Sequence, residues 1–197
     1  MQEDMRLIDF KTCNLFMRRC KEFFIKEAAL IFVLAVCFVL TILWLGFLKL
    51  YSSPLPVSDD WLLAADSNGF QSFNWNWMWA LHGEHRYPII KFLMVCSAHL
   101  GFWQLPMYLS VLVCSATSLF LVFRVREIRE KTLWADAVFP VIFLHAGHAT
   151  NFFWTMQFPF FLALCLTCII ASLLIEEPRK ALPCTPGLLP SRLFYCH

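Results

Sequence analysis

Charged side chains are scarce in this chain. Only 15% of its 197 residues are Asp, Glu, Lys or Arg, whereas 59% are hydrophobic; soluble domains carry about a quarter charged residues. The formal net charge is only +2, and no basic stripe interleaved with aromatic residues lies outside the flanks of the apolar runs, which excludes nucleic-acid binding. The low charge and the long apolar runs predict a helical membrane protein with several spans.

Cysteine is absent from the one long polar stretch, residues 51–88, although the chain contains nine cysteines. Most of them lie inside apolar runs or near the termini, so no disulfide framework is expected in an exposed loop. Cys165 and Cys168 have CxxC spacing but lie in an apolar run without other ligands nearby in the sequence. We interpret them as small packing residues rather than as a metal or redox site.

Three uncharged runs are long enough to cross a bilayer. They cover residues 28–48, 105–123 and 152–175, at about 1.5 Å per residue against an apolar layer of about 30 Å. Residues 134–150 form a weaker candidate, because Asp136, His145 and His148 interrupt them. Residues 88–101 are weaker still, because they hold Lys91 and His99.

The distribution of basic residues predicts the topology. Six Lys or Arg residues precede residue 28, so the positive-inside rule places the N-terminus in the cytoplasm. Residues 51–88 then lie outside, with Arg86 as their one basic residue. A second basic cluster, residues 124–131, is also cytoplasmic only if residues 88–101 stay at the interface and residues 134–150 cross outward.

The predicted fold class is therefore all-α: a polytopic helical membrane protein with about four transmembrane spans and with interfacial helices in the first external loop. Residues 1–27 form a basic cytoplasmic segment, and residues 28–175 form the transmembrane domain with its external loop at 51–104. Residues 176–197 are proline-containing and without periodicity, which predicts an irregular cytoplasmic tail.

Two adjacent acids, Asp59 and Asp60, follow the first apolar run by about ten residues. One interpretation is a helix N-cap, which stabilises a helix by about 1 kcal/mol. It explains one carboxylate better than two, because adjacent carboxylates repel and a site that keeps both ionised supplies a cation or a strong donor. The other interpretation is a catalytic site, with a general base and a possible Mg²⁺ or Mn²⁺ ion on these carboxylates.

A second candidate is the string His82-Gly83-Glu84-His85-Arg86, which we call the basic pentad. It holds four ionisable side chains just before residue 88. The guanidinium of Arg86 suits a phosphate because its planar fork donates two parallel hydrogen bonds, and histidine donates to phosphate or moves a proton near neutral pH. The alternatives are a solvated helix end and, as a weaker signal, a zinc site.

Further candidates are aromatic or polar. Trp75 and Trp79 stand in an aromatic stretch that predicts either an interfacial helix or a sugar-stacking surface. Asn151, Trp154 and Gln157 recur every three residues and are expected to form one polar stripe on a helix, which His148 extends. Such groups usually face protein or a wet cavity in the membrane.

The order of these motifs resembles the N-terminal part of GT-C fold glycosyltransferases, multi-span enzymes that use polyprenyl-phosphate-linked sugars. In that family the external loop after the first span opens with a paired acidic motif, which Asp59 and Asp60, followed by Trp61, match. The loop then continues in interfacial helices. The basic pentad is similar to an HxEHR-type string in bacterial membrane proteins of this kind, and the spacing from Asn151 to Gln157 is similar to another element of that group.

The resemblance covers roughly residues 25–175 and implies transfer of a sugar from a polyprenyl-phosphate donor at the outer face of the membrane, here the bacterial inner membrane. The expected partners are the lipid bilayer, the donor and further membrane subunits. The implied roles are catalysis or metal binding by Asp59 and Asp60, donor-phosphate binding by His82, Glu84, His85 and Arg86, and substrate contact or cavity lining by Trp75, Trp79, His148, Asn151 and Gln157.

Family members have more spans and an external domain, so this chain is expected to be an N-terminal portion. Two other classes of function stay open. One is a non-catalytic multi-span membrane subunit. The other is a small transporter component with His145, His148 and Gln157 along its path.

Overall fold

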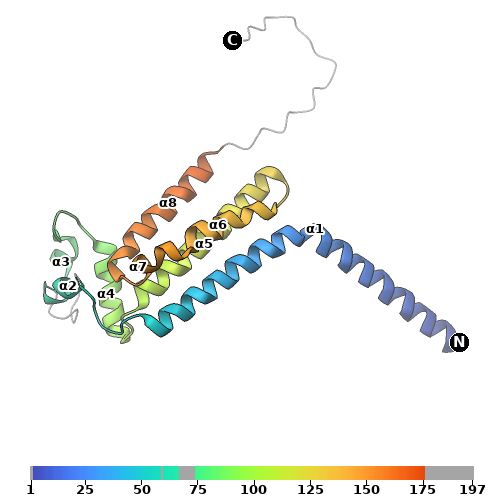
Figure 1. Cartoon of the computed structure of the whole chain (residues 1–197), viewed down its shortest axis with the longest axis horizontal. Helices are drawn as coiled ribbons and strands as arrows, with labels where there is room; N and C mark the ends of the chain where they lie inside the picture. Colours follow the sequence, from blue (N-terminus) through green and yellow to red (C-terminus); the bar gives the residue numbers. More distant parts are fainter. Residues whose placement is uncertain (1, 59, 67–73, 176–197) are drawn as a thin grey trace, which may run out of the picture.

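The computed structural model describes residues 2–58, 60–66 and 74–175, and the fold is all-α with no β-strand in these ranges (Figure 1). Three stretches are long and apolar enough to cross a membrane: Glu27–Tyr51 within α1 (Gln2–Tyr51), α5 (Leu105–Arg129), and Thr155–Leu174, which contains α8 (Phe158–Leu174). The prediction of a polytopic helical membrane protein is confirmed.

The first helix is unusually long because residues 2–51 contain no proline and a single glycine, Gly46. Its N-terminal half extends away from the other helices (Figure 1). Its apolar half packs against α5 through small polar side chains. The Thr41 and Ser115 hydroxyls lie 2.8 Å apart, and Cys37 Sγ lies 3.5 Å from Ser118 Oγ. Small residues let two helices approach closely where the surrounding lipid supplies no hydrophobic driving force.

Arginines near the end of α5 bind three other elements. The contacts, all within 3.5 Å, join Arg124 to the carbonyls of Ser172 and Ile175, Arg126 to Glu27, and Arg129 to Asp136. The end of α5 therefore meets the end of α8 and the start of the apolar part of α1. The helix α8 therefore runs parallel to α5, whereas the apolar part of α1 runs antiparallel to it.

The weak fourth span differs from a regular helix. It consists of η1 (Trp134–Ala137), α6 (Val138–Leu144), η2 (Ala146–His148) and α7 (Ala149–Phe152), each too short to cross alone. The segment still runs alongside α1 and parallel to it, since the Trp134 ring contacts Phe32 at 5.0 Å and the Phe152 ring meets Trp44 edge-on at 4.8 Å between ring centroids. Among the described residues, three helices rather than four are therefore long enough to span.

The third apolar run also begins later than expected. A helix was predicted from residue 152, but Trp154 is extended and separates α7 from the short helix η3 (Thr155–Gln157), which leads into α8. Pro159 stands in the first turn of α8, where its missing N–H costs nothing. The backbone upstream of it lacks the regular helix that the predicted polar stripe required.

Three short helices gather at one end of the bundle, which we call the outer end (Figure 1). They are α2 (Asp60–Asp66), α3 (Trp75–Trp79) and α4 (Pro88–Leu100). The last of these has 13 residues, or about 20 Å, which is too short to cross, as expected for an interfacial helix. Buried side chains from all three helices and from the start of α8 form one apolar cluster, including Leu63, Trp77, Ile90, Met94 and Phe158.

Candidate functional site

The basic pentad folds into a tight turn. His82 and His85 exchange backbone hydrogen bonds of 2.8 and 3.3 Å, and Gly83 between them has φ +60°. A positive φ at the first central position of a two-residue hairpin turn favours glycine. The turn directs both imidazoles toward Tyr87, with ring centroids at 6.5 Å for His82 and 5.7 Å for His85.

This turn lines a cavity of about 390 Å³ at the outer end. Its lining residues are Leu62, His82, Gly83, Glu84, His85, Tyr87 and Met156. Leu62 belongs to α2, which begins at Asp60, and Met156 belongs to η3. The cavity thus joins the acid-bearing helix, three ionisable side chains of the pentad and the entrance to α8, although these segments lie far apart in the sequence.

Asp60 is fully buried at the first position of α2. Its Oδ2 accepts a hydrogen bond from the Val57 N–H at 3.1 Å, and its own N–H donates to the Val57 carbonyl at 3.1 Å. The side-chain bond reaches back to a residue that precedes α2, so it differs from an N-cap bond, in which the side chain accepts from an N–H of the first helical turn. The preceding Ser58 has φ +52°, a conformation that costs a non-glycine residue about 1–2 kcal/mol. Asp59 lies outside the described residues, so its geometry relative to Asp60 stays a prediction.

Lys91 is a buried cation. In the sequence, its charge indicated only that residues 88–101 do not span the membrane. Its ammonium donates to the carbonyls of Trp77 and Ala80, both at 2.8 Å, and lies 5.2 Å from the centroid of the Trp77 ring. These contacts fasten α3 to α4 beside the cavity. The available signal was a lone lysine in an otherwise apolar 13-residue helix.

Three predicted site residues at the outer end are exposed: Arg86, Trp75 and Trp79. Arg86 is exposed and does not line the cavity. Trp75 and Trp79 are 65% and 53% exposed, whereas Trp77 between them is buried. This alternation places two indoles on the surface of α3, as both an interfacial helix and a stacking surface require.

The predicted polar stripe is divided by the irregular backbone. His148, Asn151 and Gln157 line one cavity of about 150 Å³ beside α8, whereas Trp154 packs against the apolar cluster of α2, α3 and α4. Three of the four side chains therefore come together, but from η2, α7 and η3 rather than from one helix.

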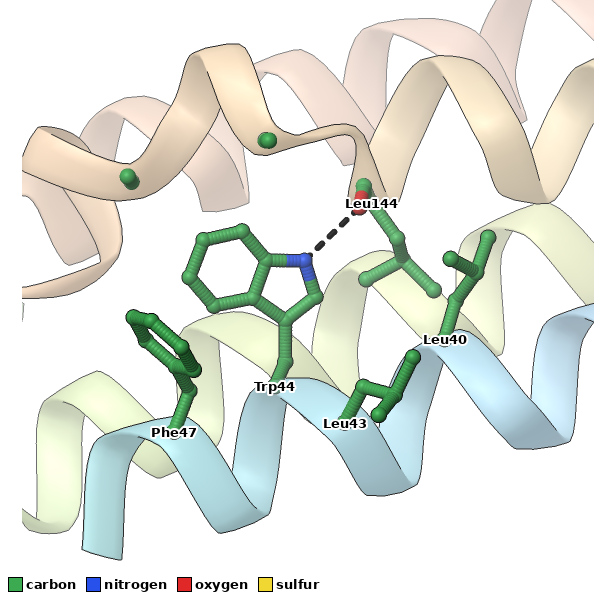
Figure 2. Close-up of a pocket in the computed structure, with 7 residues that line it drawn as sticks. Leu40, Leu43, Trp44, Phe47 and Leu144 are labelled. Atoms are coloured by element: carbon green, nitrogen blue, oxygen red, sulfur yellow. Dashed lines mark hydrogen bonds between the residues drawn. The ribbon is translucent and has the colours of Figure 1, made fainter. Parts of the chain in front are cut away.

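The break between α6 and α7 is supported by side chains. Trp44 Nε1 donates to the Leu144 carbonyl at 2.7 Å (Figure 2), and His148 Nε2 lies 3.3 Å from the Ile142 carbonyl oxygen. His145 Nδ1 accepts from the Gly147 N–H at 2.9 Å. These bonds satisfy backbone groups that a helix break leaves open in an apolar environment. Figure 2 shows the Trp44 indole in a groove of about 330 Å³ between α1 and the break.

No group of three or more His, Cys, Asp or Glu residues within the described ranges is placed to hold a metal ion. Because Asp59 is not among those residues, a divalent cation on the acid pair stays a prediction. No family model, curated protein or solved structure matches the chain.

Proposed function

We propose that this chain is a GT-C glycosyltransferase-like membrane protein, which takes a polyprenyl-phosphate sugar at the outer face of the bacterial inner membrane. Its N-terminus then lies in the cytoplasm, as the basic residues before residue 28 favour. The observation that carries the proposal is the cavity shared by Leu62 of the acid-bearing helix and by His82, Glu84 and His85.

In this proposal the prenyl chain stays in the bilayer and the phosphate sits at the pentad. His85 and the exposed Arg86 stabilise the negative charge that develops on the departing phosphate. Glu84 orients Arg86. Asp59 or Asp60 takes the proton of the acceptor hydroxyl, or holds a divalent ion that assists. The outward-facing Trp75 and Trp79 flank the sugar or the lipid.

The test is binding of a polyprenyl monophosphate to the full chain in phosphatidylcholine nanodiscs, compared with the free polyprenyl alcohol. We expect Arg86→Ala and His85→Ala each to weaken phosphate binding by about tenfold or more, since hydrogen bonds to charged groups contribute about 1.5–3 kcal/mol. Lys49→Ala is the matched control, because Lys49 is an exposed cation in the last turn of α1 that does not line the cavity.

Equal binding of the phosphate and the alcohol would remove the basis for a phosphate-linked donor. An equal loss in Lys49→Ala and Arg86→Ala would indicate a diffuse effect of surface charge. In a longer chain that transfers sugar, Asp60→Asn adds a second test, because undiminished transfer would exclude an essential charge at that position.

A further inference from the structure

A second cleft lies beside α8, away from the pentad. A chamber of about 430 Å³ is lined by nine residues: Leu121, Phe139, Ile142, Phe143, His145, His148, Phe161, Leu164 and Cys168. It shares His148, Phe161 and Leu164 with the smaller cavity that Asn151 and Gln157 line. The two spaces thus adjoin and form one cleft with an apolar chamber and a polar mouth.

The cleft lies at the level of a membrane span. Phe161, Leu164 and Cys168 belong to the stretch Thr155–Leu174, which is long and apolar enough to cross. Polar groups at such a level need partners, since each unsatisfied one costs several kcal/mol in hydrocarbon. The amides of Asn151 and Gln157 are half-buried just before and at the start of that stretch, and neither side chain hydrogen-bonds to a described residue.

The two histidines have defined hydrogen-bonding roles. The Ile142 carbonyl can only accept, so His148 Nε2 is the donor in this contact. The Gly147 N–H can only donate, so His145 Nδ1 accepts and its Nε2 carries the proton. Their rings lie 4.3 Å apart between centroids. The cleft is therefore lined by two imidazoles and two amides that can hydrogen-bond a ligand.

Among the residues that the structure describes, none of those lining either space is Lys, Arg, Asp or Glu. A phosphate or carboxylate headgroup would lack a counter-charge there, whereas a hydroxyl or carbonyl group matches the imidazoles and amides. The chamber is within the range of about 300–1,000 Å³ that is usual for small-molecule sites. We propose that this cleft binds an uncharged amphiphile, with its hydroxyl or carbonyl head at His148, Asn151 and Gln157 and its hydrocarbon part in the chamber.

The resemblance gave His148, Asn151 and Gln157 only a general substrate-contact or cavity-lining role, and the cleft includes neither the acids nor the pentad, so its test is separate from that of the glycosyltransferase proposal. The probe is a sixteen-carbon alcohol that carries a mid-chain diazirine, added to the full chain in phosphatidylcholine nanodiscs. Two matched probes carry the same chain, one with a phosphate monoester and one without any polar head. We expect saturable photolabelling of Phe139, Ile142 or Leu164 by the alcohol, and weaker labelling by the other two probes.

Gln157→Leu and His148→Phe each remove a polar partner of the head and should weaken the apparent affinity for the alcohol by about fivefold, the loss expected for one hydrogen bond between uncharged groups. Thr167→Val is the control, because Thr167 is an exposed polar residue of α8 that bonds its own helix at 2.8 Å and lines neither space. Leu164→Trp fills the cleft without removing a polar group and should abolish saturation.

Several outcomes would overturn the proposal. Labelling that rises linearly with probe concentration, or that is unchanged in all three cleft variants, would mean bulk lipid contact only. Equal labelling by the headless probe would show that the amides select nothing, and preference for the phosphate would assign a different ligand class. A cleft shielded by a second copy would give no labelling. The unfolding midpoint of each variant separates loss of binding from loss of fold.

Discussion

Removing the hydrogen bond between Trp44 and the Leu144 carbonyl tests whether side-chain bonds to the helix break stabilise this fold. Trp44 is buried, its indole N–H lies 2.7 Å from that carbonyl, and its ring packs edge-on against Phe152. The substitution Trp44→Phe keeps an aromatic ring but removes the donor. The Leu144 carbonyl at the end of α6 then faces an apolar groove without this partner.

The expected cost follows from two terms. Leaving a buried carbonyl unsatisfied costs about 1–3 kcal/mol, and the lost ring atoms leave extra space that adds about 1 kcal/mol. We therefore expect Trp44→Phe to reduce the free energy of unfolding by about 2–4 kcal/mol, a shift of roughly 5–15 °C in the unfolding midpoint for a chain of this size. The neighbouring Phe47→Leu measures the packing contribution alone, because Phe47 is half exposed in the same groove and is replaced without loss of a donor.

Buried cysteines of the chain can report unfolding through their reaction with a thiol-reactive dye. Cys37, Cys114 and Cys165 are free and buried, so a thiol-reactive dye labels them only when the helices separate. Labelling during heating in detergent gives the midpoint. Trp61→Phe is the matched control, because Trp61 is 54% exposed and an exposed substitution usually changes stability by less than about 0.5 kcal/mol. A midpoint for Trp44→Phe within error of the Trp61→Phe control would refute the reasoning.

Three further outcomes are expected. Gly147→Ala places a Cβ 2.5 Å from His145 Cε1 and displaces the ring that caps the break. The dye assay should therefore show that the free energy of unfolding falls by about 1–2 kcal/mol. The control Gly46→Ala has open space around the new Cβ and should leave stability unchanged or raise it. Lys91→Met removes the ammonium that binds the Trp77 and Ala80 carbonyls, so limited proteolysis should cut near residues 80–87 at least severalfold faster than in Lys49→Met. Arg129→Gln leaves the buried Asp136 carboxylate without its cation and should cost about 3–5 kcal/mol by thermal unfolding, against about 1 kcal/mol or less for Arg126→Gln, whose ion pair is more exposed.

Hydropathy alone predicted the three long helices, because an uncharged run of about 20 residues has few other stable structures. Their ends were less predictable. The first helix continues back to Gln2 through a charged segment, and the last begins only after an extended residue, Trp154. Both ends depend on backbone conformation, about which an apolar run carries no information.

The candidate site was predictable only in part. The pentad is local in sequence, and its glycine indicates a turn, so its clustering follows from the chain itself. Leu62 and Met156 reach the same cavity from two other segments, α2 and η3, and no periodicity relates them to the pentad. The role of Lys91 was not predicted, because a charge in an apolar run indicates only that the run does not span the membrane. Its two carbonyl partners lie in another helix and are visible only in the structure.

The two histidines and the two amides between residues 144 and 157 have different physical roles. Those at the break, His145 and His148, bond to the backbone of their own segment and thereby permit an irregular chain where lipid offers no hydrogen bonds. Asn151 and Gln157 contribute nothing of this kind, yet they lie at the same cleft. The bonds that support the break come from the two histidines, so support of the break does not account for two amides at the cleft. Their position is explained if the cleft receives a polar group from outside the chain, and the break then serves to open it.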